Sequence, residues 1–194
     1  MRRVLALLAV VGIVAVVVIG LTQTGGNDPS AGPGYDLPEA KQRLQGAPAP
    51  LAELHTQAST LIGGGKDAFE ARLASLKGHP VVINKWASWC APCQAEFGVF
   101  ESVGTERGKE VAFLGVNGTD KDPRAKRFLA KRWLPFPSYT DPHEDIAQAI
   151  EAPKNYPITV FVDKNGKTAY IHSGPYKSDK QLEDDIDKYF KLSA

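Results

Sequence analysis

Residues 81–93 read Val81-Val82-Ile83-Asn84-Lys85-Trp86-Ala87-Ser88-Trp89-Cys90-Ala91-Pro92-Cys93. The β-branched residues at the start of this stretch predict a buried strand over 81–86. We expect a helix from about Cys90 to about Thr105, because Pro92 suits a first helical turn, where its missing N–H costs nothing. The first cysteine therefore follows a strand and opens a helix.

This position gives the two cysteines of the chain, Cys90 and Cys93, different roles. Unpaired N–H groups and the helix dipole favour negative charge at a helix start, so they lower the pKa of the Cys90 thiol and make it the nucleophile. Cys93 follows one turn later, within disulfide reach but shielded by the helix. A nucleophile with a nearby resolving thiol can form and release a mixed disulfide, so we predict a redox pair.

An inert disulfide and a partial metal site are the alternatives for this pair. A closed zinc site needs further ligands, and the four histidines are scattered along the chain, at His55, His79, His143 and His172. A c-type haem attachment needs histidine directly after the second cysteine, where Gln94 stands. We expect no metal and no cofactor.

The rest of the chain alternates between strand and helix patterns. Further strands are expected over 111–116, 136–139, 158–162 and 168–172, and helices over 51–61, 66–77, 123–133, 144–150 and 178–192. Asn165-Gly166 marks a hairpin between the last two strands. This order predicts an α/β fold: a three-layer α/β/α sandwich with a central mixed sheet.

The N-terminal segment has the composition of a membrane anchor. Arg2 and Arg3 precede an uncharged run over 4–21, which as a helix would be about 27 Å long, near the hydrocarbon thickness of a bilayer. The run exceeds an ordinary signal-peptide core, and Gly20-Leu21-Thr22 is a poor cleavage site. We expect an uncleaved transmembrane helix with a cytoplasmic N-terminus and an extracytoplasmic domain. A cleaved signal and a secreted domain are the alternative.

Three segments follow from this composition: the anchor or signal over 1–21, a Pro/Gly-rich linker over 22–50 with a short helix near 39–44, and a domain over 51–194. The first part of that domain, 51–77, is expected to be a helical extension. Lys and Arg number 23 against 22 Asp and Glu, so the net charge of +1 leaves no basic footprint for nucleic acid.

Residues 84–93 resemble the active-site segment of thioredoxin-like proteins of the TlpA/ResA type, which are membrane-anchored thiol–disulfide oxidoreductases. The resemblance runs from about Gly78 to the C-terminus, through Pro135-Phe136-Pro137 and the stretch from Tyr156 to Asp163. It implies that Pro157 is cis and faces the cysteine pair, and that Trp89, Tyr156 and Pro157 contact the substrate. A trans Pro157 that merely begins a strand is the alternative.

Glu96 is the third candidate catalytic residue. It lies three residues after Cys93, on the same face of the expected helix, where a carboxylate can accept the proton of a buried thiol. The family has glutamate at this position, with such a proposed role. The alternative is an acid that the helix dipole favours near a helix start. Lys85 departs from the apolar residue usual in relatives, and either snorkels to the strand end or lowers the pKa of Cys90.

The resemblance implies reduction of protein disulfides outside the cytoplasm, with apocytochrome c as a substrate in cytochrome c maturation and a membrane thiol electron donor. Two other functions use the same cysteines. A peroxiredoxin-type thiol peroxidase shares the fold, although its peroxidatic cysteine usually lacks a partner three residues on. A Cu(I) chaperone needs a histidine, His143 or His172, close to the two thiolates.

Overall fold

The computed structural model describes residues 36–192, which form a six-stranded mixed sheet covered by helices on both faces. The strands are β1 (Leu61–Ile62), β2 (Val81–Trp86), β3 (Ala112–Gly118), β4 (Ser138–Asp141), β5 (Ile158–Val162) and β6 (Thr168–Ser173). Their order is β1-β4-β3-β2-β5-β6. The first four strands of this order run parallel, whereas β5 and β6 are antiparallel to their neighbours. The sequence-based prediction of a mixed sheet is confirmed.

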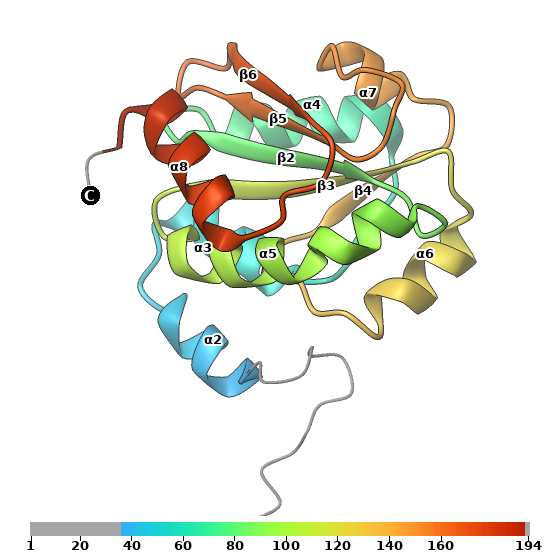
Figure 1. The fold of residues 1–194 in the computed structure, drawn as a ribbon. Helices are drawn as coiled ribbons and strands as arrows, with labels where there is room; N and C mark the ends of the chain where they lie inside the picture. The colour runs from blue at the N-terminus through green and yellow to red at the C-terminus, as the bar shows by residue number, and fades with distance from the viewer. Residues whose placement is uncertain (1–35, 193–194) are drawn as a thin grey trace, which may run out of the picture.

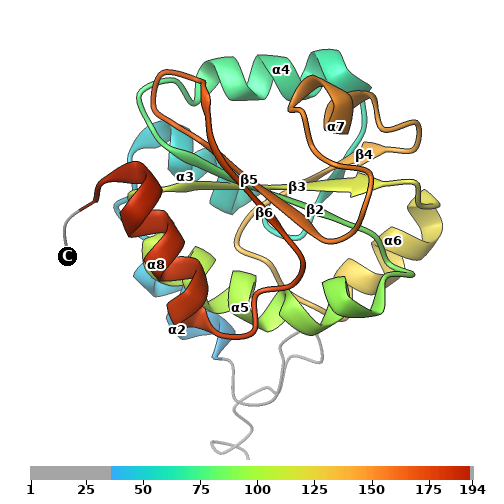
Figure 2. The ribbon, with the colours of Figure 1, turned by 45° about the horizontal axis from the view of Figure 1, so that its top comes forward.

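Helices complete the three layers (Figure 1). They are α2 (Leu37–Arg43), α3 (Ala49–Thr56), α4 (Gly65–Ser75), α5 (Ala91–Arg107), α6 (Asp122–Leu129), α7 (Asp145–Ala149) and α8 (Asp179–Phe190). Figure 2 shows α4 and α7 on one side of the sheet and α5, α6 and α8 on the other. The core is divided in the same way, because one buried cluster contains side chains of α5, α6 and α8 and another contains those of α3, α4 and α7.

Strand β2 separates these two clusters along its own sequence. Successive side chains of a strand point to opposite faces of a sheet. Val82 and Trp86 accordingly belong to the cluster under α5, and Val81 and Ile83 to the cluster under α4 and α7. All six residues of the strand are buried. The same alternation turns the two polar side chains of the strand to opposite faces. Asn84 points to the face that α5 covers, and Lys85 points to the other face.

The part upstream of β2 differs from the helical extension that the sequence predicts over 51–77. Helix α3 ends at Thr56, and the chain then forms the short edge strand β1, whose Leu61 and Ile62 pair with β4. A helix through 61 is therefore wrong. A two-residue strand carries almost no pattern, and its partner lies more than 70 residues away in the sequence. Gly64 and Gly65 then have left-handed backbone conformations and start α4.

Two further elements also differ from expectation. The strand expected over 136–139 lies two residues later, as β4 (Ser138–Asp141), and one expected helix ends early. The helix expected over 123–133 ends at Leu129, because Trp133 leaves the helix and packs with Leu37, Ala40 and Leu44 of the α2 region. This contact docks α2 on the domain, so the packed part of the described chain begins ahead of residue 50. The helix expected near 39–44 is present as α2.

The expected anchor over 1–21 and the start of the expected linker lie outside the described residues. Between residues 36 and 192, no helix has the length and apolarity needed to cross a membrane.

Candidate active site

The two cysteines lie at the N-terminus of α5, where the sequence predicts them, and they form a disulfide. Cys90 is the N-cap residue, and its sulfur accepts a hydrogen bond from the backbone N–H of Cys93 at 3.2 Å. Cys90 is 4% exposed and Cys93 is fully buried. The sulfur that a substrate can approach is therefore that of Cys90, and the same atom lies at the N-terminus of a 17-residue helix, where the helix dipole favours negative charge.

The turn that carries Trp89 and Cys90 is fixed by Asp120, a residue that the sequence analysis did not identify. The Asp120 carboxylate accepts hydrogen bonds from the backbone N–H of Ser88 at 2.6 Å, from the Ser88 hydroxyl at 3.0 Å and from Asn117 Nδ2 at 3.1 Å. Burial alone would raise the pKa of Asp120, but these hydrogen bonds outweigh it and lower the pKa. The charged carboxylate is thus the form that holds the turn in place.

Glu96 is fully buried below the cysteine pair in α5, and both of its oxygens have partners. Oε1 accepts from Asn84 Nδ2 at 2.8 Å, and Oε2 accepts from the backbone N–H of Tyr176 at 3.0 Å. Burial raises the pKa of Glu96 to about 7, although both hydrogen bonds act in the opposite direction. A carboxyl with this pKa exchanges a proton near neutral pH, as general acid–base catalysis requires.

Asn84 explains how Glu96 is held in place. It lies on β2 two residues before Trp86, so its side chain points to the face that α5 covers. The sequence pattern places Asn84 in the buried strand over 81–86 but gives it no partner. The helical periodicity of α5 and the alternation of β2 together would have brought Asn84 and Glu96 to the same interface.

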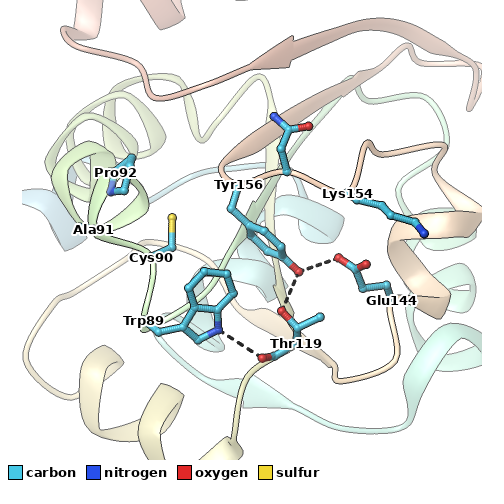
Figure 3. Close-up of a pocket in the computed structure, with 9 residues that line it drawn as sticks. Trp89, Cys90, Ala91, Pro92, Thr119, Glu144, Lys154 and Tyr156 are labelled. Atoms are coloured by element: carbon cyan, nitrogen blue, oxygen red, sulfur yellow. Dashed lines mark hydrogen bonds between the residues drawn. The ribbon is translucent and has the colours of Figure 1, made fainter.

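An open groove of about 570 Å³ lies beside Cys90 (Figure 3). It is lined by Trp89, Cys90, Ala91, Pro92, Thr119, Glu144, Lys154, Asn155 and Tyr156. Trp89 is 49% exposed, and its ring packs against the Tyr156 ring in an edge-to-face arrangement at a centroid distance of 5.3 Å. Two of the predicted substrate residues, Trp89 and Tyr156, therefore form an aromatic wall next to Cys90.

Pro157 follows Tyr156, and the peptide bond between them is cis, as the family resemblance implies. Pro157 itself is buried, and β5 begins at the next residue.

His172, considered above as a copper ligand, stacks on Tyr176 at a centroid distance of 4.1 Å. Within the described part of the chain, no group of three or more His, Cys, Asp or Glu side chains is arranged to hold a metal ion.

Comparison with known proteins connects this geometry with a family. Residues 45–187 match the Redoxin family, which is well over half of the chain. The chain belongs to this family. It is 32% identical over 124 residues to the thioredoxin-like protein YneN of Bacillus subtilis, covering 61% of this chain and 69% of YneN. It is 25% identical over 125 residues to the thiol-disulfide oxidoreductase ResA of Halalkalibacterium halodurans, covering 64% of this chain and 70% of ResA.

A solved structure agrees with these relatives. The structure of a DsbF homologue from Corynebacterium diphtheriae is similar to this member of the Redoxin family with a TM-score of 0.51 and 26% identity, covering 60% of this chain and 75% of that one. The similar sequences, the thioredoxin-like fold and the Cys90–Cys93 disulfide identify a TlpA/ResA-type protein. It is a thiol–disulfide oxidoreductase.

Proposed function

We propose that the protein reduces disulfides of extracytoplasmic protein substrates, with Cys90 as the attacking thiol and Cys93 as the resolving thiol. The observation that supports this proposal best is the position of Cys90 Sγ. It caps the helix that stabilises a thiolate, and it borders a groove open enough for a segment of another protein. Apocytochrome c is the substrate that the TlpA/ResA resemblance suggests.

The proposed reaction needs only the two thiols of the reduced protein. The Cys90 thiolate attacks one sulfur of the substrate disulfide, a mixed disulfide forms, and the other substrate sulfur leaves as a thiolate that takes up a proton. Cys93 then loses its proton and attacks Cys90 Sγ. This second step releases the substrate as a dithiol and forms the Cys90–Cys93 disulfide seen in the structure. The substrate gains two electrons, which a membrane dithiol donor must return to the cysteine pair.

We expect the reduced domain on its own to reduce one insulin disulfide per protein molecule. When a chemical dithiol is supplied to reduce the cysteine pair again, the reaction should become catalytic. The Ala91-Pro92 spacer resembles that of reducing members of the family. The redox potential is therefore expected nearer to the roughly −270 mV of thioredoxin than to the roughly −120 mV of a strong oxidant such as DsbA. Equilibration with glutathione measures the potential. Rapid consumption of hydrogen peroxide, or tight Cu(I) binding without disulfide reduction, would favour the peroxidase or the copper chaperone instead.

We further propose that residues 4–21 anchor the protein with the catalytic domain outside the cytoplasm. The run is uncharged, and the two arginines ahead of it favour a cytoplasmic N-terminus. In the native host, the full-length chain should stay in the membrane pellet after a high-salt wash, and protease added outside spheroplasts should degrade the domain. A soluble mature chain that starts near Gln23 would show a cleaved signal.

A further inference from the structure

Lys85 is a charged residue inside the central sheet. It lies on β2, in register with Val116 of β3 on one side and Ile158 of β5 on the other. Its side chain is 0% exposed, so it does not snorkel to solvent. An unpaired ammonium at such a place would be strongly destabilising. A buried lysine therefore needs partners that stabilise its charge, and the positions of those partners indicate its role.

The Lys85 ammonium has three partners, and two of them, Glu144 and Tyr156, line the groove beside Cys90. Nζ donates to the Pro153 carbonyl at 2.6 Å, forms an ion pair with Glu144 Oε1 at 2.8 Å, and lies 4.2 Å from the centroid of the Tyr156 ring. Burial alone would raise the pKa of Glu144, but the hydrogen bonds from Lys85 and Tyr156 outweigh it and lower the pKa. Glu144 is thus held as an anion against Lys85.

This ion pair holds the Tyr156 side chain at two points. Lys85 Nζ lies over the face of the ring, and Glu144 accepts a hydrogen bond from the hydroxyl. The Tyr156 hydroxyl donates to Glu144 Oε1 at 2.7 Å and accepts from Thr119 Oγ1 at 3.2 Å (Figure 3). Trp89 completes the wall, since its Nε1 donates to the Thr119 carbonyl at 3.2 Å. The Tyr156 hydroxyl also lies so close to Gly118 that a Cβ at that position would collide with it.

The same geometry argues against a direct effect of Lys85 on the Cys90 thiol. Lys85 is one residue from Asn84 on β2, so it points to the opposite sheet face from the one that α5 covers. Its charge is neutralised at 2.8 Å by Glu144. In Figure 3, Tyr156 lies between Cys90 and Glu144. The ion pair therefore contacts the Tyr156 side chain, and it acts on the surroundings of Cys90 only through the aromatic wall.

We propose that Lys85 is a positioning residue for the substrate: through Glu144 it locks the Tyr156 ring into a wall on which the peptide segment flanking the substrate disulfide packs. This inference rests on the proposed function, since it concerns the same groove. Two kinds of disulfide substrate should therefore respond differently to the loss of Lys85. A protein disulfide with flanking residues uses the wall, whereas a small disulfide without them needs only Cys90.

The test compares a disulfide-containing peptide with hydroxyethyl disulfide in the full chain. Lys85→Met is expected to raise KM for the peptide about 10-fold or more, because loss of a positioning contact can cost up to about 100-fold. Its kinetics with hydroxyethyl disulfide, and the pH midpoint of Cys90 alkylation, should not change. Lys66→Met on α4, which removes an equal charge from an exposed pair at 3.9 Å, is the matched control and should leave both substrates unaffected.

If Lys85→Met does not fold, two milder variants test whether the position of the Tyr156 ring controls peptide binding. Tyr156→Phe keeps the ring and removes its hydroxyl contacts with Glu144 and Thr119, and Gly118→Ala displaces the ring without changing any charge. Both should raise KM for the peptide alone. Equal losses with both substrates, or a shifted alkylation midpoint in Lys85→Met, would overturn the inference. If the wild type reduces neither substrate, the proposed function has failed instead.

Discussion

A Cys93→Ala variant is expected to accumulate a mixed disulfide between Cys90 and its substrate, whereas Cys90→Ser should form none and lose turnover on the order of 1000-fold or more. Cys90 Sγ is the sulfur that caps α5 and borders the groove. Cys93 is fully buried and reaches Cys90 but not the substrate. Without Cys93, the attack step proceeds and the release step has no nucleophile.

Both variants are chosen so that the fold is retained. Serine is a favourable N-cap residue, so the introduced hydroxyl can replace the Cys90 sulfur as acceptor for the Cys93 N–H. The change of Cys93 to alanine removes one buried atom and leaves a small cavity. Non-reducing electrophoresis and mass spectrometry identify the captured protein in the native host. Capture of apocytochrome c would support the suggested substrate. Trapping through Cys93, or faster alkylation of Cys93 in the reduced wild type at neutral pH, would reverse the assignment of roles.

The sequence predicts the centre of the fold well because that centre is built from local patterns. The β-branched strand over 81–86, the helix that starts at the cysteines and the Asn165-Gly166 hairpin each follow from neighbouring residues, and all are present. The strand β1 could not be predicted, because it consists of two residues that gain their hydrogen bonds from β4. The early end of α6 depends on the contact of Trp133 with α2, far away in the sequence.

The candidate site shows the same limit at the level of single residues. The cysteine pair and Glu96 lie at fixed spacings in one helix, so their relation can be read from the sequence. Lys85 and Glu144, in contrast, are brought together by the sheet order, and Glu144 has an uncommon left-handed backbone (φ 62°) at that point. A single sequence shows that Lys85 is out of place in a buried strand, but only the tertiary structure supplies its partner.

Glu96→Gln is expected to lower turnover about 10-fold or more while leaving the rate of Cys90 alkylation nearly unchanged. Attack by Cys90 needs a thiolate that the helix start already favours. Release needs Cys93 to lose a proton in a buried site, where desolvation opposes the charged thiolate. Glu96, three residues further along α5, is the carboxylate that can accept this proton. Mixed disulfides should therefore persist longer in the variant, and stopped-flow kinetics separates the two steps.

The pH dependence has a definite sign. Glu96 acts as a base only when it is deprotonated, and burial raises its pKa to about 7. The release rate of the wild type should thus increase with pH through a midpoint near 7, and Glu96→Gln should lose that increase. Glu101→Gln is the matched control, because Glu101 is also buried in α5 and burial raises its pKa to about 7 as well. It should leave turnover and the midpoint unchanged.

Stability measurements distinguish this catalytic role from damage to the fold. A carboxyl whose pKa is higher in the folded than in the unfolded chain stabilises the fold below its unfolded pKa and loses that contribution as pH rises. For Glu96 the window runs from its ordinary value of 4.5 to about 7, which corresponds to at most about 3 kcal/mol at about 1.36 kcal/mol per pKa unit. Glutamine can still accept from the Tyr176 N–H and donate to a rotated Asn84 amide. Glu96→Gln should therefore gain stability relative to the wild type as pH rises across this window, measured by urea unfolding, even as it loses turnover. Turnover equal to that of the wild type from pH 6 to 8 would show instead that Glu96 only supports the helix.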